Sequence, residues 1–320
     1  MESGGGNLRL TYKTFAVMGG RRFANQARLS SAGLPQVTVV HGNATAGGAY
    51  VPGMSDYVIT VRGQSKMFLA GPPLLKMATG EIADDEELGG AEMHAGIAGT
   101  AEWITENDAH GVAKAREAIA NLNWDMEVED QGSKESSEPL YSPDELAGVV
   151  PVDYRQPVDV REIIARIVDE SEFLEFKEEF DEYTLCGWAQ IGGFKIGIIG
   201  NNGPITAKGA VKAAQFIQLS DQTGTPLLFL QNTTGFIVGK DAETAGIIKH
   251  GSKLIQAVAN ARVPRITIMV GASFGAGNYA MCGRGYDPDF LFSWPNHRIA
   301  VMGGEQAAGV LEIVARGSAK

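Results

Sequence analysis

The sequence has only two cysteines, Cys186 and Cys282, in 320 residues, and their spacing matches no metal or redox motif. So few thiols argue against a disulfide framework and favour a reducing compartment, and each cysteine is expected to be a small buried side chain. The sequence also lacks an apolar run of the ~20 residues that span a bilayer, and its start, MESGGGNLRL, lacks the apolar stretch of a secretory signal. These absences predict a protein of the cytoplasm, or of the mitochondrial matrix in a eukaryote, with no membrane partner.

Basic residues are scarce as well. The 27 Lys and Arg residues face 38 Asp and Glu residues, and the net charge of −11 argues against nucleic acid as a partner, because phosphate binding needs a basic face. The five histidines show no metal-ligand spacing, so no metal is expected. A GxSxG elbow and a phosphate-binding GxxxxGK[S/T] loop are also missing. No other catalytic constellation with an obvious side-chain base stands out, so the base of an enzyme with this sequence could arrive on a cofactor.

The organisation along the chain indicates two domains. Residues 127–139, EVEDQGSKESSEP, are polar and acidic and have no periodicity, which is typical of a linker. We therefore expect a first domain over residues 1–126, a linker over 127–140 and a second domain over 141–320. A globular chain of this length can bury a substantial core without disulfides or metal.

The second domain alternates strand-like and helical patterns, which predicts parallel strands covered by helices, an α/β fold. Its two glycines at 192 and 193 separate two strand-like runs and predict a two-residue hairpin. The expected elements are a helix over 158–169 with Asp159 as its N-cap, strands over 183–193 and 194–202, a helix over 208–224, a strand over 226–232, a helix over 245–261 and a strand over 264–272.

The first domain shows the same alternation in a shorter form. A helix is expected over 20–33, followed by strands over 35–43, 56–63 and 66–72. Only one such unit fits before the linker, so we expect the first domain to be abbreviated.

One pattern of residues occurs twice in the chain, at a constant offset of 229. Ungapped matches of this kind indicate two homologous units. The short apolar segment after the pattern also recurs, as FLAG at 68–71 and AVMG at 300–303, with an offset of 232. The matched pairs are Pro35 and Pro264, Val37 and Ile266, Thr38 and Thr267, Val39 and Ile268, Gly42 and Gly271, Gly48 and Gly277, and Tyr50 and Tyr279.

Each copy places a glycine-rich turn after a buried strand, GNATAGGAY at 42–50 and GASFGAGNY at 271–279. Ligands of open α/β sheets bind at the carboxyl ends of such strands, and glycine lets the backbone approach a ligand closely. A helix is expected to begin in each turn, so its free amides point outward. Two adjacent N–H groups in that arrangement can stabilise a developing oxyanion.

A tight strand-to-helix turn with no chemical role is the alternative interpretation, because glycine is common at turns. The occurrence of two copies in register disfavours it. His94, in GGAEMHAG, is expected to be a hydrogen-bonded structural histidine rather than a site residue. The acidic run at 83–90 is expected to be the solvated start of a helix.

Several long motifs make the chain recognisable. It resembles the carboxyltransferase β subunits of biotin-dependent acyl-CoA carboxylases, over nearly its whole length. FGAGNYAMCGR and WPN favour the methylcrotonoyl-CoA carboxylase branch over the propionyl-CoA carboxylases. The motifs are TAGGAYVPGMSDY, FLAGPPLLKMATGE, EELGGAEMH, LLFLQNTTGF, GIIKHGSKLI, GASFGAGNYAMCGR and WPNHRIAVMGGEQAAGVL.

The resemblance implies a crotonase-like ββα spiral in each of two homologous domains, of which the N-terminal one is incomplete. It also implies a biotin-dependent ligase whose carboxyltransferase component moves a carboxyl group from N-carboxybiotin to an acyl-CoA. 3-Methylcrotonoyl-CoA, an intermediate of leucine degradation, is favoured, and acetyl-, propionyl- or geranyl-CoA are alternatives. The biotin is expected on a biotin carboxylase/biotin carrier α subunit, and the β subunits are expected to form a homo-oligomer, a hexamer in this family.

Carried onto this chain, the resemblance assigns roles to the two turns. The amides of Gly47 and Gly48 would hold the thioester enolate, and those of Ala276 and Gly277 would hold the ureido oxygen of biotin. The freed ring nitrogen of biotin would remove the proton, which explains the missing side-chain base. Further substrate-binding residues would be Ala46, Ala49, Tyr50, Gly275 and Asn278. The phosphates of CoA need cations, and Arg21, Arg22, Arg28 and Lys66 are candidates, although a solvated helix face explains the arginines equally well.

Two departures from the family keep other functions open. Family members are much longer, and the chain is expected to be truncated at both ends, entering near SGGGNL and stopping in EIVARGSAK. One alternative is a stand-alone enoyl-CoA hydratase or isomerase of the crotonase type, which would use catalytic glutamates. The other is an inactive truncated paralogue that only binds partner subunits.

Overall fold

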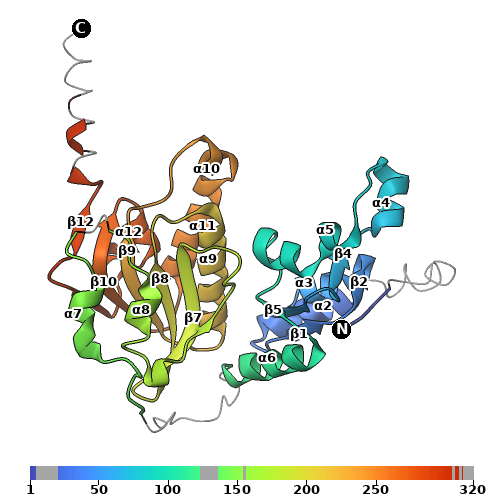
Figure 1. Ribbon diagram of the computed structural model, residues 1–320, viewed down its shortest axis with the longest axis horizontal. Coiled ribbons are helices and arrows are strands. Elements are labelled where there is room, and N and C mark those ends of the chain that lie inside the picture. The colour runs from blue at the N-terminus through green and yellow to red at the C-terminus, as the bar shows by residue number, and fades with distance from the viewer. Residues whose placement is uncertain (5–20, 123–135, 154–155, 305–306, 310–311, 313–320) are drawn as a thin grey trace. The chain divides into compact units, whose positions relative to one another are not determined.

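The computed structural model describes residues 1–4, 21–122, 136–153, 156–304, 307–309 and 312, and within them the chain forms two compact units (Figure 1). Unit 1 comprises Met1–Asp125 and the short segment Lys177–Phe180, and unit 2 comprises Met126–Phe176 and Asp181–Lys320. The expected linker over 127–140 lies largely outside the described residues. The sequence did not predict that Lys177–Phe180 belongs with the first unit.

Unit 1 is built from short parallel strands. One sheet has the order β1-β3-β5, and β2 pairs with β4. Its elements are α2 (Arg21–Ser31), β1 (Val37–Val40), β2 (Asn43–Thr45), η1 (Ala46–Gly48), α3 (Tyr50–Gly53), β3 (Tyr57–Val61), β4 (Lys66–Phe68), α4 (Pro72–Thr79), α5 (Asp85–Gly89), the π-helical turn η2 (Met93–Ile97), β5 (Trp103–Thr105) and α6 (Asp108–Ala120).

The centre of unit 1 is β3, which is buried along its whole length. Helix α6 packs on β1, β3 and β5, and its Gly111 would bring a Cβ within 3.1 Å of Val39 Cγ1. The helix begins after Asn107, whose side chain accepts a hydrogen bond from the His110 amide at 2.9 Å and so caps the first turn. A strand covered on both faces explains why the 57–61 segment is continuously apolar or β-branched.

Unit 2 contains a longer mixed sheet in the order β11-β10-β9-β8-β7-β6, with β12 also paired to β10. Strands β8 to β11 are parallel, and β6 to β8 are antiparallel. Its elements are η3 (Pro143–Glu145), α7 (Leu146–Val149), α8 (Val160–Ile164), η4 (Asp169–Ser171), β6 (Leu174–Glu175), β7 (Thr184–Ile191), β8 (Phe194–Asn201), α9 (Ala207–Gln222), β9 (Leu227–Thr233), α10 (Lys240–Thr244), α11 (Ile247–Asn260), β10 (Arg265–Phe274), α12 (Gly277–Ala280), η5 (Arg284–Tyr286), β11 (Phe290–Ser293) and β12 (Arg298–Ala300).

The alternation of side chains along these strands divides the core of unit 2 between the two faces of the sheet. On one face, Val160 and Ile163 of α8 pack against Leu185 and Ile198. On the other, Trp188 of β7 packs on Phe216 of α9, with ring centroids 4.7 Å apart. Helices α9 and α11 lie side by side in this unit (Figure 1). Successive side chains of a strand point to opposite faces of the sheet, so β7, β8 and β9 are buried along most of their length because both faces are covered.

The predicted hairpin and N-cap are confirmed. Gly192 and Gly193 join β7 to β8 with φ of 61° and 78°, the conformation of a type I′ turn. The carboxylate of Asp169 accepts hydrogen bonds from both glycine amides, at 2.8 and 2.7 Å. Asp159 caps α8 by accepting from the Arg161 amide. The helix expected over 158–169 is shorter, because only Val160–Ile164 is helical.

The repeat found in the sequence is also a repeat of strand register. β1 pairs with β3 so that Val37 lies beside Tyr57, and β10 pairs with β11 so that the matched Ile266 lies beside Phe290. In the next ladder, Asn43 lies beside Lys66, and Ala272 lies beside Arg298. The last two pairs reproduce both sequence offsets, 229 between Asn43 and Ala272 and 232 between Lys66 and Arg298.

Residues 1–3 complete this correspondence. Ser3 forms a parallel bridge with Ala44, as Thr233 of β9 pairs with Ser273 of β10 in the other unit. The first residues of the chain therefore occupy the place that the end of β9 holds in unit 2. Among the described residues, no helix is long and apolar enough to span a membrane.

Candidate functional site

The first turn follows β2 and begins at Ala46. This residue has φ of 55°, in the left-handed region, although it carries a Cβ. Gly47 and Gly48 come next within η1, and α3 begins at Tyr50. A left-handed alanine costs roughly 1 kcal/mol relative to glycine, so the surrounding structure holds this conformation against strain.

The second turn follows β10 with the same backbone path. Gly275, the residue matched to Ala46, also has φ of 55°. Ala276 and Gly277 follow, and α12 begins at Gly277. The internal hydrogen bond is repeated too, since the Ala49 amide donates to Ala46 O at 3.0 Å and the Asn278 amide donates to Gly275 O at 3.2 Å. The two turns are therefore copies in conformation as well as in sequence.

The peptide N–H groups of Gly47, Gly48, Ala276 and Gly277 have no backbone acceptor among the described residues. They are the first amides of short helical turns, which cannot be satisfied within the helix. In each turn they are consecutive, so each turn offers a pair of donors to one acceptor. Such a pair is suited to an oxygen that gains negative charge.

The matched glycines are also required for packing. A Cβ on Gly48 would lie 2.8 Å from Ser3 Oγ, and one on Gly277 would lie 2.8 Å from Gly235 Cα. At the other matched pair, a Cβ on Gly42 would meet the side chain of Glu2, and one on Gly271 the side chain of Asn232. Each turn is thus pressed against the neighbouring strand segment, which fixes where its amides lie.

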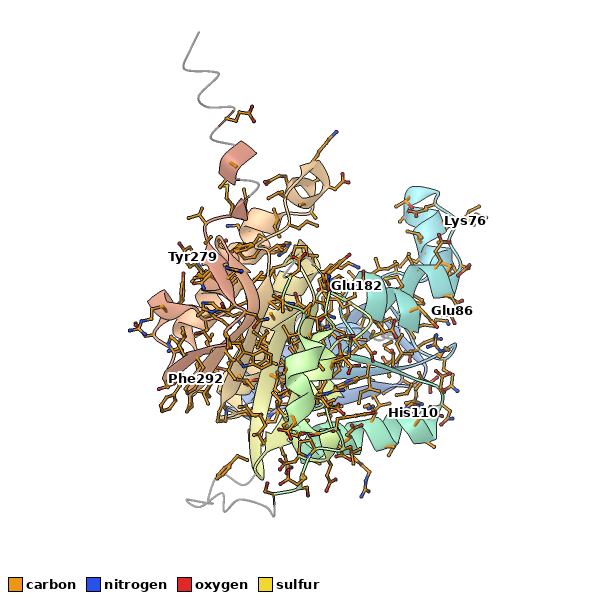
Figure 2. The ribbon with its side chains drawn as sticks, turned by 60° about the vertical axis from the view of Figure 1, so that its left-hand side comes forward. Lys76, Glu86, His110, Glu182, Tyr279 and Phe292 are labelled. Carbon is orange, nitrogen blue, oxygen red and sulfur yellow. The ribbon has the colours of Figure 1, made fainter. Side chains whose placement is uncertain are left out.

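Two matched tyrosines follow the amide pairs. Tyr50 and Tyr279 are each 50% exposed, and each packs against another ring, Phe23 at 6.0 Å and Tyr286 at 5.9 Å between centroids. Figure 2 shows Tyr279 at the surface of unit 2. An exposed ring face held by a second ring is a rigid surface for an apolar part of a ligand.

Asn278, expected to bind substrate, has its side chain engaged within the protein. Its amide nitrogen donates to Ser273 Oγ at 2.8 Å and to Gln231 Oε1 at 3.3 Å. The matched residue of the first turn is Ala49, which has no such group. The contact of Asn278 with a substrate therefore stays a prediction, and its structural contact is with β9 and β10.

The cations predicted for CoA phosphates differ in their surroundings. Arg21, Arg22 and Arg28 are exposed on α2. Lys66, in contrast, is buried in β4 and forms an ion pair with Glu86. Glu86 already neutralises the ammonium of Lys66, so the arginines of α2 are the more accessible cations of the predicted set.

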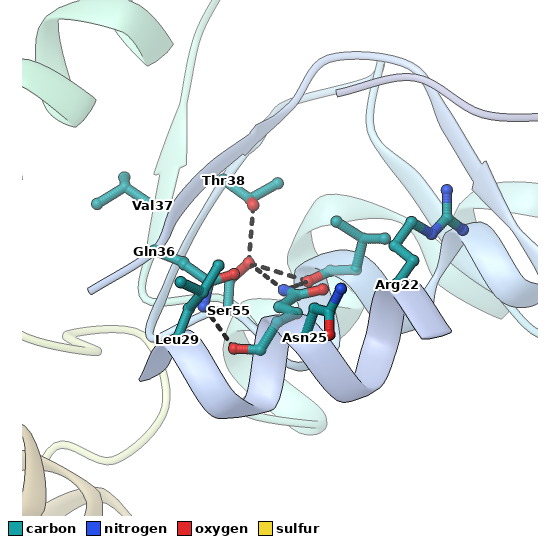
Figure 3. Close-up of a pocket in the computed structure, with 9 residues that line it drawn as sticks. Arg22, Asn25, Leu29, Gln36, Val37, Thr38 and Ser55 are labelled. Carbon is teal, nitrogen blue, oxygen red and sulfur yellow. Dashed lines mark hydrogen bonds between the residues drawn. The ribbon is translucent and has the colours of Figure 1, made fainter. Parts of the chain in front are cut away.

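One of these arginines lies at a cleft of about 640 Å³ in unit 1 (Figure 3). The cleft lies between α2, the start of β1 and the end of α3. Its wall combines amide and hydroxyl groups with apolar side chains, and Arg22 extends at one end of it. The lining residues are Arg22, Asn25, Gln26, Leu29, Gln36, Val37, Thr38, Val51 and Ser55.

His94 lies in the π-helical turn η2 and is hydrogen-bonded, as the sequence predicted. Because a carbonyl can only accept, its Nε2–H donates to Met67 O, at 2.7 Å. Its Nδ1 is buried without a partner among the described residues. Burial lowers the pKa of this imidazole, so the ring is neutral at neutral pH, and it anchors η2 to β4.

Neither cysteine is activated. Burial raises the pKa of Cys186 to about 12 and also raises the pKa of Cys282. Both are free and buried, as expected from the sequence, and a thiol with a raised pKa is a poor nucleophile at neutral pH. Among the described residues, no group of three or more His, Cys, Asp or Glu side chains is arranged to hold a metal ion.

The structure adds partners for the matched threonines that the sequence did not reveal. The side chain of Thr267 donates to Cys282 O at 2.8 Å, and that of the matched Thr38 bonds Ser55 Oγ at 2.7 Å. Each threonine thus ties its strand to the residues just after the turn helix. The threonine match was visible in the repeat, but the partners lie 15 and 17 residues away and carry no sequence signal.

Comparison with known proteins gives a consistent result. The sequence model of the carboxyl transferase domain family matches residues 1–320 of this chain. A probable biotin-dependent acyl-coenzyme A carboxylase beta2 subunit of Mycobacterium tuberculosis is 53% identical over 100% of this chain and 60% of its own length. The mitochondrial methylcrotonoyl-CoA carboxylase beta chain of Dictyostelium discoideum is 50% identical over 97% of this chain and 53% of its own length. The chain thus spans little more than half the length of these relatives.

Two solved structures are similar as well. The beta subunit of geranyl-CoA carboxylase from P. aeruginosa is 62% identical, with a TM-score of 0.57, over 100% of this chain and 60% of that one. The transcarboxylase 12S hexamer with hydrolysed methylmalonyl-coenzyme A bound is 32% identical, with a TM-score of 0.88, over 97% of this chain and 62% of that one. With a family match over its whole length and the repeated turn in both halves, the chain belongs to the carboxyl transferase domain family and has its crotonase-like α/β fold.

Proposed function

We propose that this chain provides the carboxyltransferase component of a biotin-dependent acyl-CoA carboxylase. The observation that carries the proposal is the pair of matched turns, each presenting two consecutive amides with no backbone acceptor among the described residues. Carboxyl transfer creates negative charge on two different oxygens, and each needs its own preorganised donors. A single oxyanion site would not account for two copies in the same register.

The first turn is assigned to the acyl-CoA. The amides of Gly47 and Gly48 would donate to the thioester oxygen as it becomes an enolate oxygen, and Ala46, Ala49 and Tyr50 would border that position. Both donors are neutral peptide N–H groups that are too weakly acidic to give up their proton, so they stabilise the developing charge by hydrogen bonding alone. The arginines of α2 would meet the phosphates of CoA, Arg22 foremost because it lines the cleft of unit 1.

The second turn is assigned to biotin carried by a partner subunit. The ureido oxygen of biotin starts neutral and gains charge, so two amide donors suit it better than a cation would. The amides of Ala276 and Gly277 meet this requirement. Gly275 and Asn278 would border the same position. Carboxybiotin held there would supply the carboxyl group and, once that group has left, a ring nitrogen able to take the proton. The residues of this chain hold the two oxygens and set their orientation.

For the substrate we propose a 2-enoyl-CoA with a methyl branch at C3, of which 3-methylcrotonoyl-CoA is the favoured example. The relatives named above include a methylcrotonoyl-CoA carboxylase and a geranyl-CoA carboxylase, and both acyl groups belong to this class. Charge from a conjugated carbon still reaches the thioester oxygen, so the turn alone does not separate these substrates from acetyl- or propionyl-CoA. Pocket shape has to do so, at ~1–3 kcal/mol per methylene.

The proposed partners are a biotin carboxylase/biotin carrier α subunit and further copies of the β subunit, in a hexamer like that of transcarboxylase 12S. Membership of the ligase class and a cytoplasmic or mitochondrial location stay predictions. A stand-alone hydratase needs one oxyanion turn and a carboxylate base, whereas this chain has two turns. An inactive paralogue would keep the fold without turnover, which the following experiment distinguishes.

The test uses the protein assembled with the biotin-carrying subunit and supplied with ATP, bicarbonate and a panel of acyl-CoAs. We expect the highest kcat/KM for 3-methylcrotonoyl-CoA or geranyl-CoA, and at least about tenfold lower values for acetyl- and propionyl-CoA. Blocking biotin with avidin is the control and should abolish turnover. A folded, biotin-loaded assembly that carboxylates none of the panel would contradict the proposal.

A further inference from the structure

A glutamine buried in β9 lies at the centre of a hydrogen-bond network beneath the second turn. Gln231 is fully buried, and its Oε1 accepts from Ser273 Oγ at 2.6 Å and from Asn278 Nδ2 at 3.3 Å. Its Nε2 donates to Met281 O at 2.6 Å. Because Asn278 lies within α12 and Met281 directly follows it, one side chain holds both the middle and the end of this short helix.

The strand before the turn takes part in the same arrangement. Ser273 lies in β10 just before Gly275 and bonds both Gln231 and Asn278. Thr267, also in β10 and fully buried, donates to Cys282 O at 2.8 Å. Buried polar groups of this kind are costly to leave unpaired, which gives the network a single favoured geometry. That geometry fixes the segment that carries the amides of Ala276 and Gly277.

Unit 1 contains a counterpart built from a different element. Gln26, buried in α2, donates through Nε2 to Val51 O at 2.7 Å and to Ser55 Oγ at 3.3 Å. Ser55 in turn bonds Thr38 of β1 at 2.7 Å (Figure 3). Val51 lies in α3, immediately after the first turn.

The two networks share a plan despite their different origins. In each, a buried glutamine donates its amide N–H to a carbonyl of the segment after the turn, Val51 O or Met281 O. In each, the matched threonine of the preceding strand reaches the same segment. Neither glutamine side chain reaches a turn amide itself, so any effect on the amides passes through the helix that each one holds.

We propose, on the basis of the proposed carboxyl transfer, that Gln26 and Gln231 are positioning residues, each serving one turn. Gln26 keeps the amides of Gly47 and Gly48 directed at the acyl-CoA, and Gln231 keeps those of Ala276 and Gly277 directed at biotin. An oxyanion site works only when its donors are preorganised, and a displacement of about 1 Å is enough to cost rate. Replacing each glutamine should therefore change the enzyme's kinetics for a different substrate.

The test is a comparison of Gln26→Met and Gln231→Met, which keep the side-chain volume and remove the hydrogen bonds. Transfer from the carboxylated acyl-CoA product to free biotin is followed in the assembled full-length enzyme, and both KM values are measured. We expect Gln231→Met to raise the KM for biotin about tenfold, with little change in the KM for the acyl-CoA. Gln26→Met should raise the KM for the acyl-CoA about tenfold, with little change in the KM for biotin. Gln256→Met is the matched control, because Gln256 is exposed on α11 and should leave both unchanged.

Thr38→Val and Thr267→Val give a milder second pair in case a glutamine variant does not fold, since each removes one hydrogen bond at nearly constant shape. Each threonine variant should raise the KM for the same substrate as the glutamine variant of its own unit, by a smaller factor. Folded variants that affect both substrates equally, or neither, would overturn the positioning role. Wild-type enzyme without any biotin-dependent transfer would instead overturn the proposed function, so the two failures are distinguishable.

Discussion

Among single residues, Ala46 is the position where the first turn stores strain. It has φ of 55°, and the matched Gly275 adopts the same φ without a Cβ. We predict that Ala46→Gly stabilises the chain by up to about 1 kcal/mol, because it removes the left-handed penalty. The measurement is the free energy of urea unfolding at neutral pH.

The reciprocal variant is the matched control. In Gly275→Ala the new Cβ would lie 3.2 Å from Val301 O as well as on a left-handed residue, so a loss of about 1 kcal/mol or more is expected. If both variants changed stability in the same direction, the strain assigned to this backbone position would be wrong.

The residues of the turns could be predicted from the sequence, but the glutamines that hydrogen-bond the segments after the turns could not. Gly48 and Gly277 stood out because they recur at one offset, and the structure gives both a packing reason. Gln26 and Gln231 recur at no common offset, and they bridge 25 and 50 residues to Val51 and Met281. Contacts over such distances follow from the fold, so no local pattern predicts them.

At the scale of elements, the segment Lys177–Phe180 is held in unit 1 by a buried ion pair. Lys177 and Glu102 are almost fully buried, with Nζ and Oε1 3.4 Å apart. The ammonium also donates to Gly99 O, and Glu102 accepts from the Val58 amide of β3. We predict that Lys177→Met destabilises unit 1 by about 3–5 kcal/mol, because it removes a cation that pairs with a buried carboxylate. Urea unfolding followed by circular dichroism measures the loss.

A second substitution separates the charge from the packing. In Lys177→Met with Glu102→Gln, no charge is left unpaired and the amide oxygen can still accept from Val58. The double variant should regain most of the lost stability. Should it be as unstable as the single variant, the methylene contacts of Lys177 rather than its charge would hold the segment.

The elements themselves followed from the sequence where the pattern was local. The hairpin at Gly192 and Gly193, the cap at Asp159 and the strand–helix alternation of unit 2 are all present. The helix expected over 158–169 ends at Ile164 instead. Beyond it, Ser171 Oγ caps Ala165 O and Asp169 turns to the hairpin amides. Tertiary hydrogen bonds there outweigh a helical pattern of apolar residues.

At the scale of the whole chain, the two units differ in the burial of one matched pair of strands, β3 and β11. β3 is buried in unit 1 beneath α6 and beside β5. Its counterpart β11 is an edge strand of the unit 2 sheet, and Phe290 and Phe292 are 60% and 54% exposed. These rings stack on each other at 6.2 Å, and Phe292 lies at the outer edge of unit 2 (Figure 2). An apolar edge strand is a template for association.

We therefore predict that the 320-residue chain self-associates through β11 and that Phe292→Lys reduces this association. Because the ring is largely exposed, the free energy of unfolding should change by no more than about 0.5 kcal/mol. The matched substitution in the other unit, Ile59→Lys, is the control and should unfold unit 1, since Ile59 is fully buried. Sedimentation velocity over a concentration series measures the association, and urea unfolding measures the stability. An unchanged association constant for a folded Phe292→Lys chain would exclude β11 as the contact, because a lysine on an edge strand opposes pairing with a second strand.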